Sequence, residues 1–448
     1  MTREECVERI MAQVKETVES LFEQSRAWQD GHWLYQAEHA TRDAMLRVAC
    51  AVLQSLINRR GTGHMGQWHK DETGQRREFK EYVTRPVDTL VGRITIQRAS
   101  YQGSTATPGT VQPLDKQLGL RFQFSEGVEE VAAFDASQLT YQETVGVMEK
   151  ALGLTLSETA VQEIAERWGR EAMQKRTSGI PHEPAKARMA VAADAAKIRT
   201  ATRKRKRTGS RKQRFEEHWT DAKLGVVYSF DRQGRGNADK RYTASIQGKE
   251  TFGSLLWEQI EASGADRASH VAWLGDGAEW IWTLKAEHLP HATEILDFEH
   301  AREHLESVAE AVWPANAAAA ADWVKSRKKR LLHGQVRALI AELRDLARRV
   351  GPPPRNASAD HPKKIVASNV TYFEHNASRM QYKHYRKMGF PIGSGVVESG
   401  CKHVIAHRMK ITASMSWSER RAETMLQLRC LVRSGQWESF WSLKRMAA

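Results

Sequence analysis

The spacing of apolar residues predicts helices at the start of the chain. Apolar positions recur at helical intervals through Val7, Met11, Val14 and Val18, and again within residues 45–56. The run Arg-Arg-Gly-Thr-Gly at 59–63 then interrupts the pattern, because its glycines favour a turn. Residues 1–63 are therefore predicted to form an N-terminal helical region.

Residues 64–180 combine two patterns. Up to residue 115 the chain is polar with short β-like runs, such as 89–96, which predicts a small β module. Helical spacing then returns in 141–152 and 157–168, separated by a break that contains a glycine, and Ser157 is a suitable N-cap. Such a helix pair forms either a DNA-reading helix-turn-helix or an ordinary antiparallel hairpin, and both interpretations stay open. We expect this region to bind DNA.

Beyond a linker at 177–184 the apolar pattern becomes strand-like. Strands are predicted at 189–198, 223–230, 241–247, 269–274 and 293–298. Helices are predicted at 252–262 and 300–312. Strands in a meander, followed by strands alternating with helices, predict a mixed α/β or α+β sheet. A basic helical stretch interrupts it, so the predicted core comprises 185–304 and 389–448, with a helical insertion at 305–388 and a C-terminal tail.

The charge adds an expectation about partners. Lys and Arg total 68 against 54 Asp and Glu, which gives a net charge of +14 and favours a polyanion such as nucleic acid. No apolar stretch is long enough for a membrane span, and the N-terminus lacks the apolar core of a secretory signal. The four cysteines are scattered and predict reduced thiols rather than disulfides or a zinc site. These features predict a cytosolic protein without a membrane partner.

Three carboxylates occupy positions suited to chemistry. Asp194 lies inside the apolar run 189–196, where a carboxylate must be paired, hydrogen-bonded or metal-bound. Asp276 closes an apolar strand between two glycines, which allow a ligand to approach closely. Glu398 follows a Gly-Ser-Gly turn at a predicted helix start. Each carboxylate alone is commonly a turn or cap residue, or complements a helix dipole. Together the three would supply the hard oxygen ligands that Mg²⁺ requires.

Three segments resemble motifs of bacterial insertion-sequence transposases of the ISKra type, in the Mutator-like group. Residues 273–282 (WLGDGAEWIW) resemble the motif of the second catalytic aspartate, and 294–305 (EILDFEHAREHL) resemble the motif that follows it. Residues 391–403 (PIGSGVVESGCKH) resemble the motif around the catalytic glutamate. The resemblance covers roughly residues 85–441 and keeps the order and spacing of the motifs.

This resemblance implies an RNase H-like catalytic core with a DDE triad of Asp194, Asp276 and Glu398. The triad would bind Mg²⁺, with Mn²⁺ as a substitute, and would cleave DNA strands and transfer them. The Asp-x-x-His signature falls on Asp297 and His300 as accessory residues, although His300 and His304 are also simply one turn apart on a helix. The family further implies a homo-oligomer on double-stranded element ends and target DNA, in the cytoplasm at the nucleoid.

The chain departs from the family pattern at two places. Asp194 is followed by Ala-Ala-Lys where relatives often have glycine, and no cysteine ribbon precedes the Pro-Leu-Asp element at 113–115. A ribbon-like module there is expected to be metal-free. These departures favour an alternative, a catalytically silent DNA-binding protein of transposase descent. A further alternative is an RNase H-like nuclease without strand transfer.

Basic residues near the triad are predicted to hold DNA. The run 199–214 contains nine Arg or Lys and links the Asp194 strand to the next, so we expect it to bind phosphates, although such runs are also commonly solvated. The predicted contacts are Arg203, Lys204, Arg205, Lys206, Arg207, Arg211, Lys212, Arg214, Lys402, Arg408 and Lys410. Trp280, Trp282 and Trp417 are candidates for stacking on unpaired bases, with core packing as the commoner role.

Overall fold

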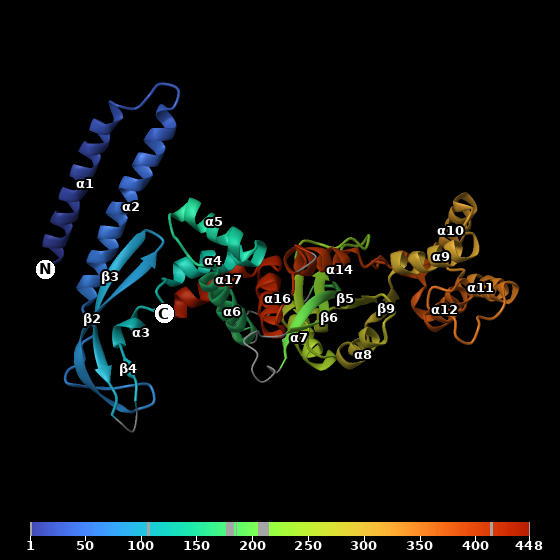
Figure 1. The fold of residues 1–448 in the computed structure, drawn as a ribbon. Helices are drawn as coiled ribbons and strands as arrows, with labels where there is room; N and C mark the ends of the chain where they lie inside the picture. The colour runs from blue at the N-terminus through green and yellow to red at the C-terminus, as the bar shows by residue number, and fades with distance from the viewer. Residues whose placement is uncertain are drawn as a thin grey trace. The chain divides into compact units, whose positions relative to one another are not determined.

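The computed structural model describes residues 2–104, 108–175, 183–184, 186–204, 215–412 and 415–447. The chain divides into two compact units, Met1–Ile164 and Ala165–Ala448, and the division falls within one helix. Figure 1 shows the fold and labels most of its helices and strands. Each unit is described by itself below.

The first unit begins with a helical hairpin, within the region predicted to be helical. Its helices are α1 (Arg3–Ser25) and α2 (Trp33–Arg60). An antiparallel sheet follows, with the strands β1 (Trp68–Lys70), β2 (Arg76–Thr89), β3 (Gly92–Gln102) and β4 (Thr110–Val111) in sequence order. Its core consists of Val87, Ile94, Ile96 and Leu114, against which Leu53 and Ile57 of α2 pack. The predicted β module is therefore a four-stranded sheet with a helix on one face.

Helices follow this sheet along the chain, and the division between the two units falls within the last of them. They are α3 (Pro113–Gln117), α4 (Glu126–Gln138), α5 (Tyr141–Leu152) and α6 (Glu158–Lys175). The break between α5 and α6 is as predicted, because Gly153 ends α5 in the left-handed region and the Ser157 hydroxyl accepts from the Ala160 N–H at 3.1 Å. Farther along α6, Trp168 packs on Trp441 with ring centroids 4.3 Å apart. This part of α6 packs on α17, and whether the pair of α5 and α6 reads DNA stays a prediction.

The second unit is built on a five-stranded mixed sheet, which confirms the predicted α+β class. Its strands are β5 (Arg188–Arg203), β6 (Phe215–Ser229), β7 (Arg241–Ser245), β8 (His270–Gly275) and β9 (Thr293–Leu296). The spatial order is β7-β6-β5-β8-β9. The first three strands are antiparallel, and β8 and β9 run parallel to β5. Apolar runs such as Met189–Ala193 are buried because this part of the sheet is covered on both faces.

Helices alternate with the later strands and then form the predicted insertion. The first set is α7 (Lys249–Ser263), the 3₁₀ turn η1 (Ala265–Arg267), α8 (Glu279–His288) and α9 (Phe298–Val312). The insertion comprises α10 (Ala317–Leu332), α11 (Val336–Val350), α12 (Pro362–His375), the 3₁₀ turn η2 (Ala377–Arg379) and α13 (Tyr382–Lys387). Within it, α12 packs on both α9 and α11. Among the described residues, no helix has the length and apolarity that crossing a bilayer requires.

The chain then returns to the sheet. The last elements are α14 (Gly395–Gly400), the π-helix η3 (Cys401–Ala406), α15 (His407–Met409), α16 (Glu419–Arg433) and α17 (Trp437–Ala447). A Cβ added at Gly400 would lie 2.7 Å from the Leu224 side chain on β6. Glycine at this position therefore lets α14 approach the sheet closely, which fixes where Glu398 lies.

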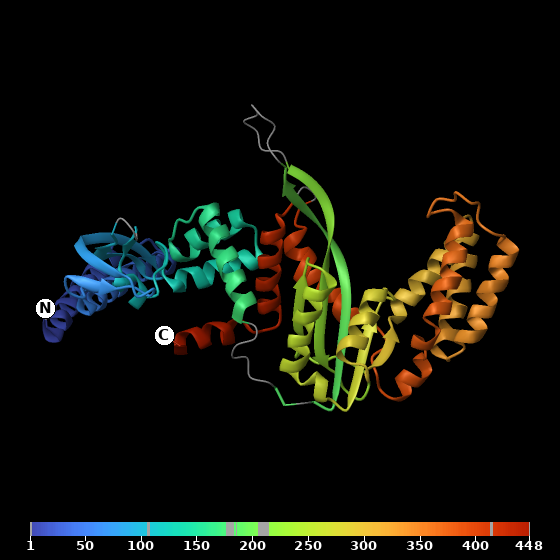
Figure 2. The ribbon, with the colours of Figure 1, turned by 90° about the horizontal axis from the view of Figure 1, so that it is seen from below.

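Strands β5 and β6 extend far beyond their neighbours. They pair from Met189 opposite Ser229 to Arg203 opposite Phe215. The partner β8 pairs only as far as Ala192, and β7 only from Lys223 onward. The outer part of the hairpin, residues 197–203 and 215–222, is called the arm below, and Figure 2 shows it projecting past the other strands. One edge of the arm contacts Trp417, whose backbone N–H donates to the Arg199 carbonyl at 3.0 Å.

Candidate active site

One edge of the sheet collects the carboxylates that the sequence singles out. The strands β5, β8 and β9 are parallel, so their carboxyl ends meet at the same edge, where sites in such sheets commonly lie. Asp194 lies two residues past the last pairing of β5 with β8. Asp276 directly follows β8, and Asp297 directly follows β9. Glu398 reaches the same edge from α14, because Ser394 at its start contacts Asp297.

Asp194 is a half-buried carboxylate with weak local partners. Its Oδ1 accepts from the N–H of the next residue, Ala195, at 2.7 Å, and its Oδ2 accepts from the Cys401 thiol at 3.4 Å. Burial raises the pKa of Asp194, and the charge of Asp276 raises it further, while His300 opposes the shift. Asp194 and Asp276 therefore lie within electrostatic reach of each other, and neither forms an ion pair with a described Lys or Arg.

Asp276 lies in a loop that the helical insertion holds in place. Its Oδ1 accepts from the Ala278 N–H at 2.9 Å. Its backbone carbonyl accepts from the Tyr372 hydroxyl of α12 at 2.8 Å. Gly277 adopts φ +107°, and a Cβ there would lie 2.9 Å from the Tyr372 ring, so only glycine lets the ring and the loop approach this closely. Burial and the nearby Asp276 charge raise the pKa of Tyr372, which keeps its hydroxyl a donor.

Asp297 joins the start of α9 to the Glu398 turn. Its Oδ1 accepts from the N–H groups of Glu299 at 3.1 Å and Ser394 at 3.0 Å. Its Oδ2 accepts from the backbone N–H of His300 at 3.2 Å and from the Ser394 hydroxyl at 2.8 Å. The same hydroxyl lies 3.2 Å from Glu398 Oε1. Burial raises the pKa of Glu398, and the charge of Asp297 adds to the rise.

The two histidines of α9 have different surroundings. The His304 ring stacks on Tyr372 with centroids 3.6 Å apart, and its Nδ1 lies 2.6 Å from the Asn369 side-chain oxygen. Burial lowers the pKa of His304. His300 Nδ1 lies 3.3 Å from a carboxylate oxygen of Glu303, one turn along the helix. His300 and His304 therefore do lie one turn apart on a helix face, and His300 in addition acts electrostatically on Asp194.

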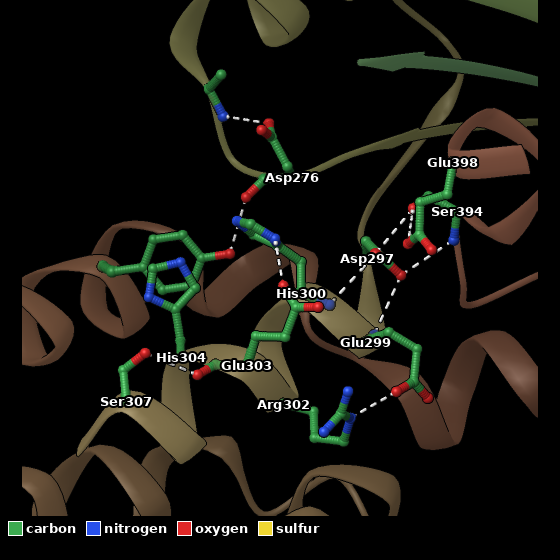
Figure 3. Close-up of polar contacts among 12 residues, drawn as sticks. Asp276, Asp297, Glu299, His300, Arg302, Glu303, His304, Ser307, Ser394 and Glu398 are labelled. Atoms are coloured by element: carbon green, nitrogen blue, oxygen red, sulfur yellow. Dashed lines mark hydrogen bonds and ion pairs between the residues drawn. The ribbon is translucent and has the colours of Figure 1, made fainter. Parts of the chain in front are cut away.

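The carboxylates form two pairs rather than one cluster. Figure 3 shows Asp297, Ser394 and Glu398 gathered together, with Asp276 apart from them. Cys401 lies within electrostatic reach of both pairs. Burial raises the pKa of its thiol, and the charges of Asp194 and Glu398 raise this pKa further. Within the described part of the chain, no three His, Cys, Asp or Glu side chains surround one point as a formed metal centre would require. The donors themselves, carboxylate oxygens without a cationic partner, are those that a hard divalent cation prefers.

The predicted DNA-contacting residues differ in exposure. Lys402 and Lys410 are exposed, and the charge of Lys410 lowers the pKa of Cys401, which places it near the carboxylates. Arg408 is only 1% exposed and lies 4.9 Å over the Trp417 ring, so the prediction that it contacts phosphates does not fit its buried position.

The other predicted basic contacts belong to the long hairpin. Arg203 is exposed at the end of β5, and Lys204 lies 3.0 Å from a carboxylate oxygen of Glu216. The remaining members of the predicted set lie outside the described residues: Arg205, Lys206, Arg207, Arg211, Lys212 and Arg214.

The tryptophans proposed for base stacking are mostly core residues. Trp282 and Trp417 are buried, and Trp280 packs edge-on against Phe252 at 5.6 Å. Their core interpretation is confirmed for Trp282 and Trp417. The sequence interpretation missed Tyr372, which no pattern marks, and Ser394, whose place in the Gly-Ser-Gly turn beside Glu398 is a usable signal.

Comparisons with known proteins give little beyond this geometry. No protein-family model matches the chain, and no curated protein matches it. Among solved structures, the chain is similar to one from a Drosophila P element transposase strand transfer complex, with 10% identity and a TM-score of 0.36. That similarity covers 70% of this chain and 93% of the other. A similarity this weak carries no argument about function, and the ISKra-type assignment stays a prediction.

Proposed function

We propose that this chain is a DDE-type transposase with an RNase H-like core, acting on DNA by metal-dependent phosphoryl transfer. One observation carries the proposal: carboxylates from separate elements lie along one sheet edge, and none of Asp194, Asp276 and Glu398 forms an ion pair with a described Lys or Arg. Like charges held close together are costly unless a counter-charge is supplied, and partial burial adds to the cost for Asp194 and Asp276, whereas Glu398 is exposed. They fall on the residues that the motif resemblance assigns to the triad, Asp194, Asp276 and Glu398.

In this proposal the triad would hold Mg²⁺, with Mn²⁺ as a substitute. Bound ions would activate the attacking hydroxyl and stabilise the oxygen that leaves. Water attacks the phosphorus at the element end and the bond to the 3′ oxygen breaks. The freed 3′-hydroxyl then attacks a phosphorus of target DNA and displaces its 3′ oxygen, so one phosphodiester is broken for each one formed.

The accessory residues would act by positioning. Asp297 holds Ser394, and Ser394 in turn contacts Glu398 at 3.2 Å. His300 lies close enough to Asp194 to stabilise its ionised form. Tyr372 fixes the carbonyl of Asp276 and so the direction of that loop. All three contacts would maintain the carboxylates in place without touching the DNA.

The proposed partner is double-stranded DNA, both the element ends and the target. The net charge of +14 supports a polyanionic partner, and so does the exposed Lys410, whose charge acts on Cys401 beside Asp194. We further propose that the protein acts as a homo-oligomer on paired ends, in the cytoplasm at the nucleoid. Pairing of the two ends in one oligomer would allow both to be joined to one target.

A cleavage assay tests the proposal. Purified protein is incubated with labelled DNA that carries the sequences flanking its own coding region, with Mg²⁺ or with EDTA. The variants are Asp276→Ala and, as a matched control, Glu279→Ala, which removes an exposed carboxylate at the first residue of α8. We expect Mg²⁺-dependent nicking and joining that Asp276→Ala abolishes and Glu279→Ala retains.

The products separate the proposal from its alternatives. Nicking without joining to new DNA identifies an RNase H-like nuclease. Tight DNA binding with no cleavage in any divalent metal identifies a catalytically silent DNA-binding protein, for which the Ala-Ala-Lys sequence after Asp194 is the favouring observation. Normal cleavage by Asp276→Ala contradicts the assigned triad.

A further inference from the structure

The two faces of the arm differ sharply in exposure. On one face Ile198, Thr200 and Ala222 have no exposed surface. Thr200 and Thr220 share a hydrogen bond of 2.6 Å there, and the Trp417 segment lies along this edge. Residues alternate between faces along a strand, so their immediate neighbours point the other way. The arm therefore has one packed face and one face directed to solvent.

The solvent face carries two large aromatic side chains. Trp219 is 63% exposed and Phe215 is 62% exposed. Trp219 is paired with Arg199 and Phe215 with Arg203, and directly opposed residues of an antiparallel pair lie on the same face. Among the described residues, neither ring has an aromatic or cationic partner. Two large aromatic rings exposed on a projecting β-ribbon indicate a binding surface.

The same face carries three basic side chains, Lys197, Arg199 and Arg203, against the two carboxylates Asp221 and Glu217, so it is weakly cationic. Lys197 lies beside the rings with an Nζ to Asp221 distance of 3.0 Å and a side chain that is 65% exposed. Arg199 is 2.7 Å from Glu217, which holds its guanidinium along the ribbon. The sequence then continues into the run 199–214 with nine Arg or Lys. Basic side chains interleaved with exposed rings are the pattern of proteins that follow a nucleic-acid backbone and stack on its bases.

We propose that the solvent face of the arm binds DNA and that Trp219 stacks on an unpaired base, with Phe215 as a second stacking ring. This inference rests on the proposed function in taking DNA as the partner. The arm begins on the strand that carries Asp194, so DNA held there lies near the strand end that would be processed. Unpaired bases are expected where a duplex end is opened for cleavage.

A second copy of the chain is the competing occupant of this face. Two rings among basic and acidic side chains offer little apolar area, whereas a stable protein interface needs about 1,200 Å² or more of buried surface. The face lacks the apolar centre typical of such interfaces. Stacking on DNA needs only the rings and their cationic neighbours.

Binding of the full-length protein to DNA tests the inference. Fluorescence anisotropy is measured in EDTA with two labelled probes of the same sequence, a blunt duplex and a duplex with a single-stranded 3′ extension. The variants are Trp219→Ala, Trp219→Phe and, as a matched control, Trp33→Ala, a tryptophan of the first unit that is 47% exposed. We expect Trp219→Ala to weaken binding of the extended probe roughly 5- to 100-fold. Trp219→Phe should retain most of the affinity, and Trp33→Ala should bind as the parent does.

The salt dependence distinguishes stacking from charge. Trp219→Ala should leave the slope of log affinity against log salt unchanged, because no phosphate contact is lost. Equal weakening for both probes, or unchanged affinity for the extended probe, would overturn the inference. A change in oligomeric state by light scattering with unchanged DNA affinity would assign the face to a second copy and also overturn it. Because EDTA prevents cleavage, loss of catalysis in the earlier assay and failure of the arm proposal are separate results.

Discussion

Two aspartates that follow neighbouring parallel strands have opposite surroundings. Asp297, after β9, is 2% exposed and its oxygens accept four hydrogen bonds, from Glu299, His300 and twice from Ser394. Asp276, after β8, is partly exposed, and the described residues give its carboxylate a single bond, from the Ala278 N–H to Oδ1. One carboxylate is saturated by the protein, and the other keeps acceptor positions open.

The number of hydrogen bonds therefore suggests different roles for the two carboxylates: Asp297 stabilises the site, and Asp276 is available to bind a ligand. A carboxylate whose lone pairs are occupied has little capacity left for a metal ion, while an open one next to another uncompensated carboxylate has both capacity and need. The position of a residue at a strand end does not distinguish the two roles, since both aspartates directly follow a parallel strand. The predictions below test whether the open aspartate serves chemistry and the saturated one serves architecture.

The largest effect is expected for Asp276→Asn. It keeps the Ala278 contact but removes the charge, so cleavage should fall by more than about 100-fold, beyond the roughly 10- to 100-fold typical of losing an outer-shell partner. The melting temperature should not fall. Rates are measured in Mg²⁺ on the labelled flanking DNA, with Glu279→Gln as the matched exposed carboxylate. Cleavage within a few-fold of the parent would remove Asp276 from the triad.

Asp297→Ala should act mainly on stability. It leaves buried donors at the start of α9 and in the Ser394 turn without acceptors, which costs about 2–4 kcal/mol. Equilibrium denaturation in urea measures the change in the free energy of unfolding. Ser394→Ala, which removes one hydroxyl, is the milder control and should cost about 1 kcal/mol. If Asp297→Ala instead folds normally and loses only cleavage, Asp297 belongs to the chemistry and the comparison fails.

Tyr372→Phe probes how the insertion holds the open aspartate. The change removes only the hydroxyl that donates to the Asp276 carbonyl. We expect the cleavage rate to fall roughly 10-fold and the Mg²⁺ concentration needed for half-maximal cleavage to rise, because the Tyr372 hydroxyl orients the loop that carries Asp276. Tyr385→Phe is the matched control, because its hydroxyl donates to the Glu294 carbonyl on β9 at 3.0 Å, away from Asp276. Equal Mg²⁺ dependence in the two variants would reduce Tyr372 to a structural role.

The sequence predicted most elements because their ends carry local signals. Gly153 and Ser157 mark the break between α5 and α6, and the apolar run around Asp194 marks a buried strand. Contacts between distant segments left no such signal, as with Tyr372 and Asp276. No sequence pattern marked the π-helix at Cys401–Ala406 either, and Arg408, two residues beyond it, is buried although its charge had predicted a phosphate contact.

Asp194→Asn extends the comparison to a carboxylate that is neither saturated nor freely exposed. Burial and Asp276 raise the pKa of Asp194 above its usual 3.8, so the folded state binds this proton more tightly than the unfolded state. The carboxyl therefore favours folding most at acidic pH, and this contribution is lost as pH rises through the raised pKa. In EDTA at neutral pH, the variant should therefore be more stable than the parent.

The sign and the ligand dependence make this prediction specific. The stability difference between the Asp194→Asn variant and the parent should vanish below the unperturbed pKa of 3.8, where both side chains are neutral. Added Mg²⁺ should raise the melting temperature of the parent and not that of the variant, because a ligand stabilises only the form that binds it. Denaturation across pH with and without Mg²⁺ measures both effects. A variant that is less stable than the parent at neutral pH would mean that Asp194 is held by the fold, as Asp297 is, rather than kept open for a cation.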